Sequence, residues 1–188
     1  MNLESCHGVA NLRDGASLRS SGFRVVVRLG VGARRVGYGE RDPIGCTGEA
    51  LSPSELIETV TQWARLDDRV IAFGLCGSYA RGNPGPDSDI DFIVLCQEPK
   101  SLLEDRSWIQ GFGSEARVAG PVEDYNLVQS FRVFYGTTEA EFGVTDQAWA
   151  QLPLDQETAR VIHDGLKILY DPERRLADAA AFAAKMFP

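Results

Sequence analysis

Apolar and polar positions alternate along most of the chain with the periods of helices and strands. Leu56, Val60 and Ala64 recur at helical spacing, and the run Ser52-Pro53-Ser54-Glu55 before them has the residue types of a capped helix start. We therefore expect an amphipathic helix from about Pro53 to Leu66.

The apolar runs that follow this helix predict a mixed α/β layout. Strands are expected at Arg69–Cys76, Ser88–Cys96, Leu127–Tyr135 and Thr137–Thr145, with a tight turn at Gly136; helices at Ser101–Gln110, Asp155–Asp164 and Glu173–Met186; and a short strand or extended arm at Leu166–Tyr170. No internal repeat is visible. The predicted fold class is therefore α/β (α+β), with helices and strands intermixed along the chain.

Residues 1–50 have a different composition from the rest. They contain nine glycines, seven arginines and no lysine, and Phe23–Leu29 is the one segment with the pattern of a short strand. Such a segment offers little apolar surface for a core, so we expect a loosely ordered extension. The predicted organisation is an N-terminal extension over residues 1–50 and a folded domain over residues 51–188.

The overall composition is that of an ordinary globular protein, with 44% hydrophobic and 24% charged residues. We see no membrane span or signal peptide, so a cytoplasmic location is the default expectation. The net charge of −8 argues against tight non-specific binding of nucleic acid. The four cysteines lack CxxC spacing and there are two histidines, which disfavours a disulfide framework, a zinc site or a histidine-rich metal site.

Asp89 and Asp91 stand two residues apart at the start of a predicted strand, so both carboxylates should lie on one face while Ile90 points to the core. Two carboxylates this close repel each other unless a cation lies between them. Oxygen ligands without nearby histidine or cysteine suit Mg²⁺. The alternative is a pair of solvated carboxylates at the mouth of a strand.

The preceding strand ends in Gly77-Ser78, where glycine permits close approach of the backbone to a ligand. The following residues can begin a helix whose free N–H groups face an anion, and Ser78 adds a hydroxyl donor. Arg81 could contact phosphates or brace the loop. The Gly82–Pro86 segment cannot be helical and should return the chain so that Ser88 and Asp89 lie beside Ser78. Together these features point to a nucleoside triphosphate with a metal ion on its phosphates.

The series GS, ARG and SDID within residues 77–91 resembles the signature of the nucleotidyltransferase superfamily, which has the DNA polymerase β-like fold. The small bacterial members, aminoglycoside-type and minimal nucleotidyltransferases, are the most similar groups. The resemblance implies a short mixed sheet flanked by helices. It also implies that Gly77, Ser78, Arg81 and Ser88 contact the triphosphate, and that Asp89 and Asp91 bind divalent metal. Beyond the motif, residues 51–170 match in layout only.

The superfamily usually has a third carboxylate on a later strand, and the resemblance places it in Thr138–Gly143. Glu139 and Glu141 alternate onto one face of that segment, and we select Glu141. Its implied role is to complete a second metal site or to take the proton of the attacking hydroxyl. The alternative is an outward-facing residue of an antiparallel strand.

The resemblance implies an enzyme that uses two Mg²⁺ ions and transfers a nucleoside monophosphate, AMP from ATP or the equivalent from another triphosphate, to an acceptor hydroxyl. A cationic small molecule such as an aminoglycoside would suit the charge of residues 51–188, which hold twelve basic and twenty-two acidic groups. One alternative is a minimal-nucleotidyltransferase antitoxin that modifies or binds a helical toxin protein. A nucleotide-binding module without activity is another, disfavoured by the intact Ser78, Asp89 and Asp91.

Overall fold

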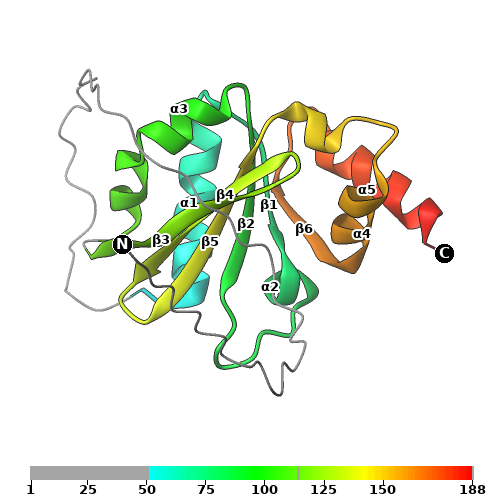
Figure 1. Cartoon of the computed structure of the whole chain (residues 1–188). Helices are drawn as coiled ribbons and strands as arrows, with labels where there is room; N and C mark the ends of the chain where they lie inside the picture. The colour runs from blue at the N-terminus through cyan, green and yellow to red at the C-terminus, as the bar shows by residue number, and fades with distance from the viewer. Residues whose placement is uncertain (1–50, 114, 188) are drawn as a thin grey trace, which may run out of the picture.

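A computed structural model describes residues 51–113 and 115–187, which form a six-stranded mixed sheet with helices on both faces (Figure 1). The strands are β1 (Val70–Cys76), β2 (Ile90–Cys96), β3 (Ala116–Tyr125), β4 (Val128–Tyr135), β5 (Thr138–Thr145) and β6 (Leu166–Tyr170), in the spatial order β3-β4-β5-β2-β1-β6. Only β2 and β5 pair in parallel among these neighbours. The predicted fold class is confirmed, while the predictions made for residues 1–50 lie outside the described residues.

The described helical segments largely follow the predicted pattern. They are α1 (Pro53–Leu66), α2 (Gly77–Arg81), α3 (Pro99–Glu104), α4 (Gln156–Gly165) and α5 (Arg175–Met186), with 3₁₀ segments η1 (Ser107–Phe112) and η2 (Gln147–Ala150). Helix α1 begins at a complete capping box, in which Ser52 and Glu55 exchange hydrogen bonds. Its buried face then packs on the sheet through Leu56, Val60 and Ala64.

Four phenylalanines on four adjacent strands form a continuous row on the sheet face covered by α1, α3 and η1. Phe131, Phe142, Phe92 and Phe73 come from β4, β5, β2 and β1, with successive ring centroids 5.6, 5.0 and 5.3 Å apart. Side chains alternate between the two faces of a strand, so the residues flanking these phenylalanines point to the opposite face. The aromatic row therefore fixes which residues of β2, β4 and β5 lie on that opposite face.

The opposite face carries a second apolar core. Helices α4 and α5 and the η2 segment supply Trp149, Ile162, Leu176 and Ala179, which pack with Ile93 and other sheet residues. In Figure 1 these helices, in orange and red, stand at the β6 end of the sheet, away from the β3 edge. This core continues along β2 toward Asp91, so the polar residues at the strand ends lie next to packed apolar side chains.

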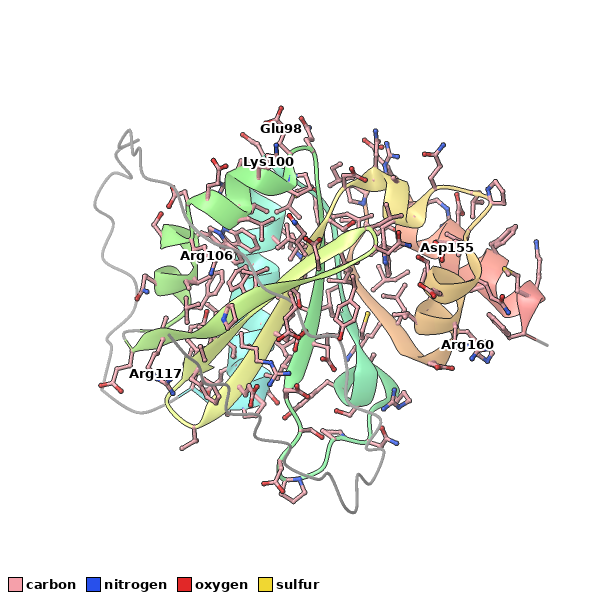
Figure 2. The ribbon with its side chains drawn as sticks, viewed as in Figure 1. Glu98, Lys100, Arg106, Arg117, Asp155 and Arg160 are labelled. Carbon is pink, nitrogen blue, oxygen red and sulfur yellow. The ribbon has the colours of Figure 1, made fainter. Side chains whose placement is uncertain are left out.

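Most charged side chains lie on the outside of the fold. Glu98, Lys100, Asp155 and Arg160 are exposed and point away from the sheet (Figure 2). Asp91, in contrast, is only 9% exposed. Carboxylates are seldom buried without a partner, so a buried acid of this kind requires an explanation.

Two predictions about secondary structure are wrong in detail. The single helix expected at Ser101–Gln110 is the short helix α3 followed by the separate 3₁₀ segment η1. Strand β3 was not predicted, because Gly120 and Pro121 interrupt its pattern. Its pairing with β4 shifts register between Ala119 and Glu123, and this irregularity accommodates both residues in an edge strand.

Within residues 51–113 and 115–187, no helix combines the length and the apolar character required to cross a bilayer. The cytoplasmic location expected from the sequence stays a prediction.

Candidate active site

The Gly-Ser corner lies directly against the aspartate pair. Strand β1 ends at Cys76, and Gly77 opens the short helix α2 with a positive φ of 65°. This backbone conformation favours glycine. A Cβ atom at this position would also overlap Oδ2 of Asp91. The close approach of the Gly77 backbone to the acid therefore requires glycine on two separate grounds.

Three carboxylates meet beside this corner. Asp89, Asp91 and Glu141 each offer an oxygen, and these oxygens all lie within 4.8 Å of one another. Asp91 lies on β2 directly opposite Glu141 on the parallel strand β5. Asp89 precedes β2 and is not part of it, which corrects the predicted strand start at Ser88. The structure thus brings together the three residues selected as metal ligands from the sequence.

Asp91 is held in an unfavourable state for a carboxylate. Its Oδ1 atom is buried and has no hydrogen-bond partner among residues 51–113 and 115–187. Burial raises the pKa of Asp91 to about 7, and the nearby charges of Asp89 and Glu141 add to the increase, whereas Arg132 and Arg81 oppose it. An ionised Asp91 therefore needs a cation beside it.

Glu141 has a different environment, because hydrogen-bond donors from β4 reach both of its oxygens. The Ser130 hydroxyl donates to Oε1 at 2.7 Å, and the Arg132 guanidinium donates to Oε2 at 3.0 and 3.2 Å. Burial raises the pKa of Glu141, while the bonds from Ser130 and Arg132 act in the opposite direction. Glu139, the other candidate third carboxylate, is half-buried and accepts a 2.7 Å bond from Arg132. Of the two glutamates, only Glu141 belongs to the three-carboxylate group.

The other predicted triphosphate contacts surround the corner. Ser78 is half-buried, and its carbonyl accepts a bond from Asn83 N–H at 3.1 Å. Arg81 is exposed and donates to the Asp164 carbonyl at the end of α4 at 3.2 Å, which agrees with the bracing role considered for it. Ser88 closes the loop, since its hydroxyl accepts a 2.9 Å bond from Gly85 N–H. These contacts hold the loop that carries Asp89 next to α2.

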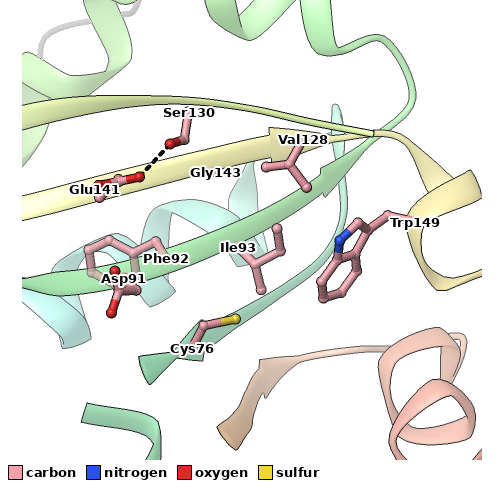
Figure 3. A pocket seen from close by; sticks show the side chains of 9 residues that line it. All are labelled: Cys76, Asp91, Phe92, Ile93, Val128, Ser130, Glu141, Gly143 and Trp149. Carbon is pink, nitrogen blue, oxygen red and sulfur yellow. Dashed lines mark hydrogen bonds between the residues drawn. The ribbon is translucent and has the colours of Figure 1, made fainter. Parts of the chain in front are cut away.

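A narrow hollow of about 20 Å³, roughly the room of one water molecule, lies beside the carboxylates along the sheet (Figure 3). Asp91 and Glu141 lie at one end and Trp149 at the other, with Ile93 and Val128 between them. Trp149 is 3% exposed and packs in the second apolar core, and it also lines this hollow.

Arg132 and Ser130 are site residues that the sequence reasoning missed. A usable signal was present, because the predicted tight turn at Gly136 fixes the register of β4 against β5. Tyr135 pairs with Thr138, so Arg132 must pair with Glu141.

The carboxylate group fits the Mg²⁺ expected from the sequence. It offers only oxygen ligands, and the unpartnered Oδ1 of Asp91 lacks the interaction that a divalent cation would supply. Cys76, which also lines the hollow, is no competing ligand. Burial raises the pKa of its thiol to about 12, and the charge of Asp91 adds to the increase, so the thiol stays protonated.

A family model described as the nucleotidyltransferase domain matches residues 56–130. The matched segment runs from α1 to β4 and includes the Gly-Ser corner, Asp89 and Asp91, but not Glu141. Residues 56–130 are therefore a nucleotidyltransferase domain, which confirms the assignment to this superfamily made from the sequence.

Fourteen chains of solved structures match this chain. One of them is an aminoglycoside 6-adenyltransferase from Bacillus subtilis, with 12% sequence identity and a TM-score of 0.39; the match covers 51% of this chain and 36% of that chain. This chain thus corresponds to about a third of the length of that protein. No curated protein matches the chain.

Proposed function

We propose that this chain is a Mg²⁺-dependent nucleotidyltransferase that moves a nucleoside monophosphate, AMP from ATP in the first instance, onto an acceptor hydroxyl. The observation that carries the proposal is the buried Oδ1 of Asp91, which has no partner, lies in a group of three carboxylates and belongs to a residue that contacts the Gly-Ser corner. A solvated pair of aspartates would not leave one carboxylate oxygen buried and unsatisfied.

In this reaction Asp89 and Asp91 would hold Mg²⁺, with Glu141 completing the carboxylate group. Bound Mg²⁺ would neutralise charge on the phosphates and favour the deprotonated form of the acceptor hydroxyl. The backbone at Gly77 and the hydroxyl of Ser78 would hold the triphosphate. Beyond this, the site would act by positioning the reacting groups, as expected for phosphoryl-type transfer.

The acceptor that we propose is a cationic small molecule. Residues 51–188 carry twelve basic and twenty-two acidic groups, and such a balance attracts cations.

The test uses ATP labelled at the α-phosphate, with the full chain, Mg²⁺ and a panel of amino sugars and polyols. We expect the label to move to an amino sugar with release of pyrophosphate, and EDTA to stop the transfer. Label on a co-purified protein would instead support the antitoxin alternative. Absence of transfer to any acceptor, together with absence of Mg²⁺-dependent ATP binding, would contradict the proposal.

A further inference from the structure

The three carboxylates of the site are not equivalent, because one of them already has a cation. Arg132 contacts Glu141 through two nitrogens, while Asp91 Oδ1 has no partner in the part of the chain that the structure describes. At this site the aspartates are open to an ion, whereas Glu141 already has the fixed positive charge of Arg132 beside it.

The guanidinium of Arg132 is held in place from two sides. Its Nη1 donates to Glu139 at 2.7 Å, its Nη2 donates to Glu141 at 3.0 Å, and its side chain is only 22% exposed. Strand pairing places Arg132 directly opposite Glu141. The planar guanidinium is always charged and matches carboxylates geometrically, so the positive charge at this position is fixed.

We propose that Arg132 supplies the second positive charge of the site, so that the chain binds a single divalent ion at Asp89 and Asp91. Arg132 is then a positioning residue that orients Glu141 and places its charge beside the reacting groups. A second ion at Glu141 would have to displace the guanidinium or lie against a like charge. The inference rests on the proposed function and modifies the expectation of two Mg²⁺ ions.

The test is titration of the full chain with Mn²⁺ alone, with free Mn²⁺ measured by electron paramagnetic resonance. We expect one Mn²⁺ per wild-type chain and the same for Arg132→Lys, which keeps the charge. Arg132→Met keeps much of the apolar stem but removes the charge, so it should bind a second Mn²⁺ at the uncovered Glu141. The double variant Arg132→Met/Glu141→Gln should return to one.

Two bound ions in the wild type, or one ion in Arg132→Met, would overturn the inference and leave the proposed function standing. No Mn²⁺ bound by the wild type would remove both. If Arg132→Met does not fold, Glu141→Gln decides the matter. We expect it to bind one Mn²⁺ with affinity within about threefold of the wild type, and a loss of about 10-fold or more would assign Glu141 to the ion.

Discussion

Asp91 and Glu141 lie directly opposite each other on the parallel strands β2 and β5, yet only Glu141 has hydrogen-bond donors for both carboxylate oxygens. The difference arises from the next strand, because β4 borders β5 and not β2. Ser130 and Arg132 therefore reach Glu141, whereas Asp91 Oδ1 has no such donor among the described residues.

Replacement of Asp91 by asparagine should abolish the transfer without unfolding the protein. Asparagine has nearly the same shape but lacks the negative charge that the ion requires. We expect transfer from labelled ATP to fall by about 100-fold or more, the scale of losing one electrostatic contact of a transition state. The matched control is Asp87→Asn in the exposed loop, which should keep its activity. Full activity of Asp91→Asn would refute the assignment of Asp91 to the ion.

Gly77→Ala should damage the site more than Gly82→Ala, although both glycines have positive φ angles, 65° and 72°. Both variants should lose about 1 kcal/mol from backbone strain. Only at Gly77 would the new methyl group collide with Asp91, whereas no atom of the described residues lies within 4 Å of a Cβ at Gly82. Urea unfolding and ATP transfer measure the two effects. Equal losses in the two variants would contradict the close packing of Gly77 on Asp91.

The stability of the metal-free protein should fall as the pH rises from about 4 to about 7. Burial raises the pKa of Asp91 from its ordinary value of 3.8 to about 7, so in this range the folded state holds a proton that the unfolded state has released. The proton favours the folded state at low pH, and this advantage is lost above pH 7, by on the order of 2–4 kcal/mol.

Urea unfolding in EDTA at several pH values measures this effect. Asp91→Asn should show a shallower pH dependence and exceed the wild type in stability at pH 8, while Mg²⁺ should restore the wild type. If the metal-free wild type instead gains stability between pH 4 and 7, the charge of the buried Asp91 carboxylate is already compensated by other groups of the protein.

Glu141→Gln should lower transfer by about 10–100-fold, because Arg132 loses the carboxylate that orients it. Glu139→Gln should lower transfer less than Glu141→Gln, because Glu139 holds Arg132 through Nη1 alone and lies outside the three-carboxylate group. Both variants replace a glutamate of β5 by glutamine and remove one negative charge, so each serves as a control for the other. A larger loss for Glu139→Gln would mean that the wrong glutamate was selected from the sequence.

The local parts of the site could be predicted from the sequence because they depend on short segments. The Gly-Ser corner follows β1, and the aspartate pair lies at the start of β2, the next strand of the chain. The segment Gly82–Pro86 between them cannot be helical, so it turns the chain back and brings the corner and the aspartates together. The capping residues likewise located the start of α1 at Pro53.

The parts of the site that depend on contacts between distant segments were harder to predict from the sequence. Parallel pairing of β2 with β5 joins segments about fifty residues apart, and no local pattern specifies which strands become neighbours. The choice of Glu141 over Glu139 depends on that pairing. The identity of its partner Arg132 follows from the β4–β5 turn, but only once both strands are placed on one face.

The central claim is that a divalent ion joins Asp91 to a triphosphate held at the Gly-Ser corner, and the most direct measurement is a crystal structure with Mn²⁺ and a non-hydrolysable ATP analogue. We predict an anomalous Mn²⁺ peak about 2.2 Å from Oδ1 of Asp91, with the triphosphate on Gly77 and Ser78. A triphosphate bound elsewhere, or a Mn²⁺ peak with no contact to Asp91, would contradict the account.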